Sequence, residues 1–206
     1  MSKALLLPLL LPSPPKRRFI ESDSKLLARL YERKQYTCII ERARTLSAVT
    51  PDIVRVALSS IRKQQQRSSA LADSFHCPLL QLARGVVSRL DRQLVTAAHL
   101  CKLLEIHVSS MMPAAPLPRQ IHPWLSAFTY YGVEPSVHAF AILMNAYLQS
   151  GDTEYALWIY RGMERGELTV AATGFLRAET LRMPPPNAVA VATAAAAWCR
   201  LRRWPL

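Results

Sequence analysis

The fold of this chain is decided by residues 135–168, PSVHAFAILMNAYLQSGDTEYALWIYRGMERGEL. In the first half of this stretch, apolar residues recur at i, i+3, i+4 and i+7, which places them on one helical face: Phe140, Leu143, Met144 and Tyr147. The second half repeats this spacing at Ala156, Ile159, Tyr160 and Met163. The sequence therefore predicts two amphipathic helices in succession.

Between the predicted helices, residues 150–153 (SGDT) supply the signals that end one helix and begin the next. Gly151 can adopt the left-handed conformation that closes a helix, and Asp152 or Thr153 can cap the N–H groups of the following helix. Pro135 is tolerated in a first helical turn, because its missing N–H would have no partner there. Each helix is about 20 Å long, too short to be stable alone in water, so this antiparallel hairpin must pack against neighbours.

Helical patterns cover most of the remaining sequence. A proline begins a new apolar stripe at Pro51, Pro78 and Pro123, in the first-turn position that a helix tolerates. Two proline-rich stretches, residues 109–120 and 183–186, break the pattern. The chain holds only six glycines, and no stretch alternates convincingly in the way that a strand does. We therefore expect an all-α fold of roughly eight to ten helices with no strand.

The hairpin also carries a set of residues at fixed places: a proline at the start, a valine and an aromatic residue soon after it, a glycine at the turn, an Ala-Leu pair and a late methionine. They are Pro135, Val137, Phe140, Gly151, Ala156, Leu157 and Met163. In this order they resemble the repeat unit of the pentatricopeptide family. A second copy lies 51 residues later, where Pro186 falls on Pro135 and Ala197 on Ala146, and a weaker one covers residues 26–46.

The tetratricopeptide repeat is the nearest alternative, since it shares the glycine at the turn and the alanine of the second helix. That family prefers a small residue where Met163 stands and a proline at the end of its unit, whereas this chain has its prolines at the start. The intervals from Pro51 to Pro135 and on to Pro186 are longer than one repeat. We therefore expect insertions between the units, one of them near residues 167–186.

The pentatricopeptide resemblance implies antiparallel helical hairpins stacked as a short right-handed α-solenoid. Four parts of the chain follow: a leader over residues 1–20, a basic helical-hairpin region over 21–108, a proline-rich linker over 109–120 and a repeat region over 121–206. In this family, the first helices of successive repeats line a groove that binds single-stranded RNA, one base per repeat. The resemblance thus implies an RNA-binding protein.

The family's base-reading positions fall here on side chains that cannot pair with a base. A small polar residue early in the first helix is replaced by Ala141 in the opening hairpin and by Ala192 in the last repeat. The position at the repeat junction falls near Val170 or Ala171, and His138 is a further position that can contact or stack on a base. We therefore expect low sequence specificity, with RNA bound mainly through its phosphate backbone.

The charge of the chain also favours an anionic partner. It carries 26 Lys or Arg against 14 Asp or Glu, an excess that is typical of proteins that bind polyanions. Residues 16–67 hold 13 basic and 5 acidic residues, whereas residues 121–180 hold 3 basic and 6 acidic ones. Each basic side chain alone is as well explained by a solvated helix face. As a group, we predict these phosphate contacts: Arg29, Arg33, Lys34, Arg42, Arg44, Arg62, Lys63 and Arg67.

Motifs of catalysis and metal binding are missing from the sequence. It has no Gly-rich phosphate loop, nucleophile elbow, HExxH pair or acid cluster for magnesium, so we expect no enzyme and no cofactor. The four cysteines form no CxxC pair, and His76-Cys77 and His99-x-Cys101 lack the two close ligand pairs of a zinc site. We expect reduced thiols and no bound metal.

Residues 1–20 contain four basic residues and no acidic one. This composition is typical of an organelle-targeting leader, which we expect to be disordered. Its apolar run is too short and too rich in proline to cross a bilayer, and no other segment is long enough. We expect a mitochondrial protein, with a plastid or the cytoplasm as alternatives.

Two functions remain consistent with the sequence. One is an organellar RNA-binding adaptor that acts in mitochondrial RNA processing, stability or translation. The other is a helical scaffold for protein–protein contacts, for example a subunit or assembly factor of a mitochondrial ribonucleoprotein particle. The position of the basic side chains distinguishes them, because a stripe along the first helices favours RNA.

Overall fold

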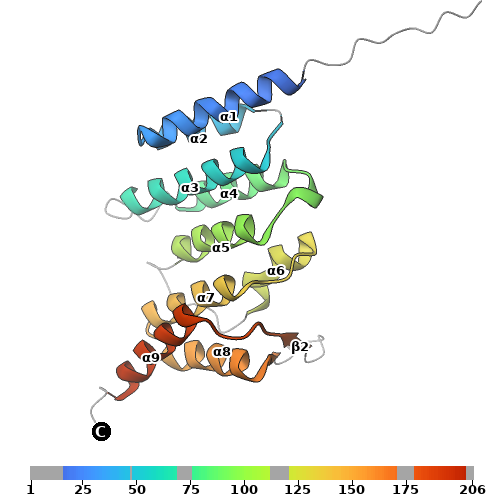
Figure 1. Cartoon of the computed structure of the whole chain (residues 1–206). Coiled ribbons are helices and arrows are strands. Elements are labelled where there is room, and N and C mark those ends of the chain that lie inside the picture. The colour runs from blue at the N-terminus through green and yellow to red at the C-terminus, as the bar shows by residue number, and fades with distance from the viewer. Residues whose placement is uncertain (1–15, 47, 69–75, 112–120, 171–178, 203–206) are drawn as a thin grey trace, which may run out of the picture.

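The computed structural model of this chain describes residues 16–46, 48–68, 76–111, 121–170 and 179–202. Within them the chain is mostly helical, which confirms the expected all-α class at the level of secondary structure (Figure 1). The helices of this part are α1 (Lys16–Glu32), α2 (Tyr36–Thr45), α3 (Pro51–Ser68), α4 (His76–Ser88), α5 (Ala97–Met111), α6 (His122–Tyr131), α7 (Val137–Gln149), α8 (Thr153–Arg165) and α9 (Ala188–Arg202). A 3-10 turn, η1 (Arg92–Leu94), and two strands, β1 (Glu167–Val170) and β2 (Glu179–Arg182), complete them.

The leader and the linker predicted from the sequence fall largely outside the described residues. Of the leader, residues 16–20 already belong to α1, and of the linker, residues 109–111 belong to the end of α5. Residues 1–15 and 112–120 lie outside the part of the chain that the structure describes.

The odd-numbered helices form a row. α1, α3, α5, α7 and α9 pack side by side in that order, each against the next. The even-numbered helices pack against this row: α2 on α1 and α3, α4 on α3 and α5, α6 on α5, and α8 on α7 and α9. Figure 1 shows the hairpins following one another along the molecule from α1 to α9. Helices that are far apart in sequence can therefore share one face.

The core confirms the two helical faces predicted for residues 135–168. The buried side chains of the first stripe are Phe140, Leu143, Met144 and Tyr147, and those of the second are Ala156, Ile159, Tyr160 and Met163. Trp124 on α6 donates its indole N–H to the Tyr147 hydroxyl at 3.1 Å, which joins α6 to α7 inside the core. Burial raises the pKa of Tyr147 to about 12, so the hydroxyl stays protonated near neutral pH.

The turn between α7 and α8 is built as the sequence predicts. Gly151 has a φ of +87°, in the left-handed region. The Asp152 carboxylate accepts a hydrogen bond from the Tyr155 N–H at 3.2 Å, so Asp152 is the residue that caps α8. Pro135 differs from its predicted place: it lies one residue before Ser136, the N-cap of α7, and outside the first turn.

The prediction that the chain has no strand is wrong. β1 and β2 pair antiparallel, with Glu167 opposite Arg182. This hairpin packs closely on α8 because Gly162 leaves room for Leu168, and a Cβ added at Gly162 would lie only 2.5 Å from Leu168 Cδ1. The described part of the insertion expected near residues 167–186 therefore includes a β-hairpin.

Substitutions at Gly151 and at Gly85 should change the stability of the protein in opposite directions. Gly151→Val should lower the free energy of unfolding by about 1–2 kcal/mol, because a β-branched residue is strained at positive φ. Gly85 is the matched control in α4, since an added Cβ there meets nothing within 4 Å. Gly85→Ala should raise the free energy of unfolding by about 0.5–1 kcal/mol. Chemical denaturation measures both, and equal stability of Gly151→Val and the parent would show that the turn has another conformation in solution.

Candidate nucleic-acid interface

A groove of about 540 Å³ crosses the odd-numbered helices α3, α5, α7 and α9. Side chains three or four residues apart share a helical face, which explains which residues each helix contributes. α3 contributes Ser59, Arg62, Lys63 and Gln66, and α5 contributes Lys102, Glu105, Val108 and Ser109. α7 contributes His138, Ala141, Ile142, Asn145, Ala146 and Gln149, and α9 contributes Val189 and Thr193. The groove thus gathers cations, amides and hydroxyls from helices that are distant in sequence.

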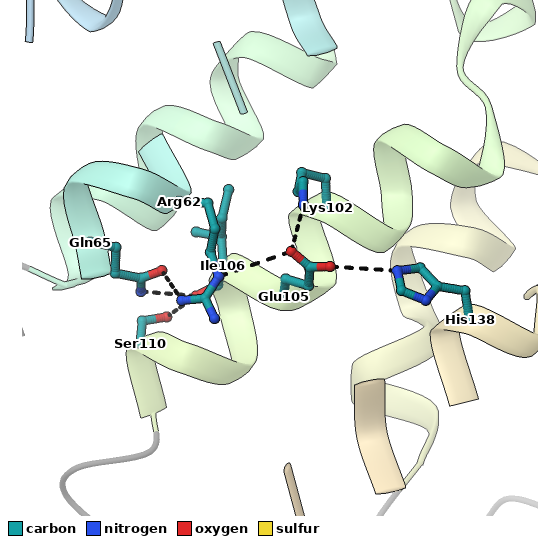
Figure 2. Close-up of polar contacts among 7 residues, drawn as sticks. All are labelled: Arg62, Gln65, Lys102, Glu105, Ile106, Ser110 and His138. Carbon is teal, nitrogen blue, oxygen red and sulfur yellow. Dashed lines mark hydrogen bonds and ion pairs between the residues drawn. The ribbon is translucent and has the colours of Figure 1, made fainter. Parts of the chain in front are cut away.

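Four charged or chargeable side chains meet in this groove. Lys102 Nζ donates to Glu105 Oε2 at 2.8 Å, and Arg62 Nε lies 3.9 Å from the same oxygen. His138 Nε2 lies 3.5 Å from Glu105 Oε1. Figure 2 shows these side chains converging on the one carboxylate from neighbouring helices. An anion that enters the groove would therefore meet several positive groups at once.

A buried amide fixes α3 against α5 beneath these charges. Gln65 Nε2 donates to the Ile106 carbonyl at 3.2 Å, and the Gln65 side chain is buried. The Ser110 hydroxyl donates to the same carbonyl at 3.1 Å. Arg62 Nη1 lies 3.5 Å from Gln65 Oε1, also drawn in Figure 2. Gln65 therefore links α3 to α5 beside Arg62.

α7 presents two amides to the groove. Asn145 and Gln149 are exposed, and neither side chain has a hydrogen-bond partner among the described residues. Ala141, one of the positions singled out by the family resemblance, is buried in the groove wall. Ala192, the other, is exposed on α9 in an adjoining hollow of about 470 Å³ that it shares with Asn145 and Thr193. The α7 amides thus lie in the same hollows as these alanines.

The structure places some of the basic residues predicted to contact phosphate in the groove and others outside it. Arg62 and Lys63 line the groove. The guanidinium carbon of Arg67 lies 4.7 Å from the ring centre of an α2 tyrosine, and Arg42 pairs with the buried Asp23 at 2.7 Å. The remaining four are exposed and do not line the groove: Arg29, Arg33 and Lys34 lie near the junction of α1 and α2, and Arg44 lies in the last turn of α2.

Several residues of the groove are not predicted from the sequence, among them Lys102, Glu105, Asn145 and Gln149. Lys102 and Glu105 lie outside the strongly basic residues 16–67, and Asn145 and Gln149 are not at the base-reading positions of the family. A signal was present, because each pair is three or four residues apart on an otherwise apolar helix. Polar pairs at this spacing on apolar helices therefore indicate these four residues of the groove.

A second hollow, of about 640 Å³, lies between α4, α5 and α6. Aromatic and aliphatic side chains dominate its lining, among them Trp124, Phe128 and Tyr130. The His107 and Trp124 rings lie 4.9 Å apart, and burial lowers the pKa of His107 to about 4, so the imidazole is neutral near pH 7. Arg84 is the cation of its described lining. A polyanion finds more positive charge in the groove.

The structure also bears on metal binding and membrane insertion. Across the described ranges, no group of three His, Cys, Asp or Glu side chains is placed to hold a metal ion. His99 is instead engaged in the core: its Nδ1 accepts from the Thr96 N–H at 3.2 Å, and its Nε2 lies 3.1 Å from the Pro51 carbonyl. Desolvation lowers the pKa of His99. No described helix combines the length and apolar character that a bilayer span requires.

No family model, no curated protein and no solved structure matches this chain. The arrangement of its own residues therefore carries the functional argument.

Proposed function

We propose that this chain is a pentatricopeptide-like RNA-binding protein, in which the helical hairpins form a short right-handed α-solenoid. A single RNA strand lies along the groove of the odd-numbered helices. The observation that supports this proposal is the groove itself, to which four successive odd-numbered helices contribute side chains. Extended faces of this kind are the binding surfaces of stacked helical repeats.

The groove offers both kinds of contact that a single strand needs. Arg62, Lys63 and Lys102 supply positive charge to the phosphates, which gives affinity that does not depend on sequence. Asn145 and Gln149 supply amide donors and acceptors to base edges. Because the charge of the three cations acts on every phosphate whatever its base, backbone contacts dominate and preference among sequences stays low.

In the cell, we propose an adaptor role in mitochondrial RNA processing, stability or translation. The support for this part comes from the sequence, which has an acid-free basic leader and no catalytic motif. Chemistry on the RNA is then left to partners, while this chain holds the strand.

A filter-binding titration with single-stranded RNA tests the proposal. Two phosphate contacts, one at Lys63 and one shared by Arg62 and Lys102, predict a slope of log affinity against log salt of about −1.4, since each contact in a single strand contributes about −0.7. Homopolymers and mixed sequences should differ by less than about tenfold, well below the discrimination of specific recognition. Absence of binding at low salt, or a slope near zero, contradicts the proposal.

A protein scaffold is the second candidate, and α9 is the observation that favours it. Outside the groove, this helix exposes three large apolar side chains on one helical face, which together offer a surface for another helix: Val191, Trp198 and Leu201. Val191→Lys should then abolish capture of protein partners after nuclease treatment while RNA affinity is unchanged. If the parent protein loses its protein partners when nuclease digests the RNA, those partners were held through RNA, which counts against the scaffold.

A further inference from the structure

The cluster around Glu105 draws on separate helices. Arg62 belongs to α3, Lys102 and Glu105 belong to α5, and His138 belongs to α7. Their side chains are between 20% and 63% exposed, with Glu105 the least exposed. They are open to the groove yet partly shielded from bulk water, so charges here interact more strongly than on an open surface.

The Glu105 carboxylate does not make close contacts with all of the positive or chargeable groups around it. Only Lys102 approaches it at hydrogen-bond length, 2.8 Å, while Arg62 stands at 3.9 Å and His138 at 3.5 Å. Arg62 Nη1 also lies 3.5 Å from Gln65 Oε1, the outer limit of a hydrogen bond. Three positive or chargeable groups are thus gathered around an anion that engages one of them fully.

We propose that Arg62, Lys102 and His138 form a single phosphate-binding site, and that the Glu105 carboxylate occupies it in the free protein. An RNA phosphodiester binds by displacing this carboxylate. The choice of RNA as the source of the phosphate rests on the proposed function. A phosphodiester carries one negative charge shared by two terminal oxygens, as a carboxylate does, so it makes the same charge-assisted contacts.

Displacement has a direct consequence for affinity. Glu105 must give up its contact with Lys102, and its negative charge then repels the incoming phosphate. The carboxylate therefore acts as an internal competitor and weakens RNA binding. If Glu105 served instead to orient Lys102 and Arg62 for RNA, its neutralisation would weaken binding, so the two roles predict opposite signs.

The test is Glu105→Gln, which removes the charge and keeps the shape. RNA affinity should rise about fivefold, as expected for one competing charged contact. Glu41→Gln is the matched control, because Glu41 is exposed on α2 outside the groove and the change in net charge is the same. The control should stay within about twofold of the parent. Glu105→Met, with an apolar side chain of similar length, replaces the Gln variant if that variant fails to fold.

A double-mutant cycle tests whether the gain in RNA affinity depends on Arg62 and Lys102. In an Arg62→Gln, Lys102→Met background, Glu105→Gln should change RNA affinity by less than about twofold, because the site that it uncovers is gone. Equal or weaker RNA binding by Glu105→Gln in the native background overturns the inference and leaves the proposed function standing. A gain of the same size from Glu41→Gln overturns it as well.

Binding of inorganic tripolyphosphate tests the phosphate site independently of the proposed RNA-binding function. If neither the parent nor Glu105→Gln binds RNA, the proposed function fails, and calorimetric titration with tripolyphosphate decides the site. Binding that is about fivefold tighter in Glu105→Gln than in the parent supports the site. Equal affinity, or no binding by either protein, overturns it.

Discussion

Replacing Arg62, Lys63 and Lys102 together by glutamine should lower RNA affinity about 25-fold at 0.1 M salt, because two single-strand phosphate contacts, one at Lys63 and one shared by Arg62 and Lys102, contribute about 1.4 decades there. The slope of log affinity against log salt should flatten by about 1.4. All three side chains line the groove, two from α3 and one from α5. Filter binding at several salt concentrations measures both quantities.

The control is a second triple variant that removes the same charge. Arg29, Arg33 and Lys34 are exposed near the end of α1 and do not line the groove. Their replacement by glutamine should change affinity by less than about threefold, since exposed charges that make no direct contact with a phosphate are weakened by salt screening. If this control variant loses as much RNA affinity as the variant with the groove substitutions, the RNA does not bind in the groove of α3, α5, α7 and α9.

Arg89→Met should lower the free energy of unfolding by about 3 kcal/mol, because one guanidinium serves several helix-end carbonyls and hydrogen bonds to charged groups are among the stronger ones. Arg89 Nη2 donates to Ala43 O at 2.9 Å, and Nη1 donates to Leu46 O at 2.8 Å and to Arg44 O at 3.3 Å. These are carbonyls at the C-terminal end of α2, which the helix itself leaves without donors. Methionine keeps the packing volume and removes all of these donors.

Thermal unfolding checks this prediction, with an expected fall in Tm of roughly 10 °C for a chain of this size. Arg55→Met is the matched control, because Arg55 pairs with Asp52 in an exposed contact at 3.2 Å within α3. Its replacement should change the free energy of unfolding by less than about 0.5 kcal/mol. Equal effects of the two substitutions would mean that Arg89 does not hold the end of α2 in solution.

The hairpin of α7 and α8 was predictable because its determinants are local. Apolar spacing, the glycine at the turn and the capping aspartate all lie within residues 135–168, and Gly151 and Asp152 have the backbone and cap geometry that the sequence indicates. The β-hairpin after α8 was missed for the opposite reason. Leu168 reaches its buried place only because Gly162, on the preceding helix, lets the strand approach.

The candidate site was predictable in its chemistry and only partly in its residues. Counting charge identifies Arg62 and Lys63, but it cannot separate them from Arg42, which is used to pair with Asp23. Which side chains converge depends on how α3, α5 and α7 are rotated against each other. Buried contacts such as that of Gln65 with the Ile106 carbonyl fix this rotation, and they join residues 41 positions apart.

Ultraviolet cross-linking of the full chain to single-stranded RNA, followed by mass spectrometry of the modified peptides, tests the central claim most directly. RNA in the groove should cross-link to peptides of α5 and α7, whose side chains form most of the described groove lining. His138 is the expected point of attachment, because it is an exposed aromatic group in the groove wall. The absence of cross-linked peptides, or their confinement to α2, α4 and α8, would contradict the claim that this groove binds RNA.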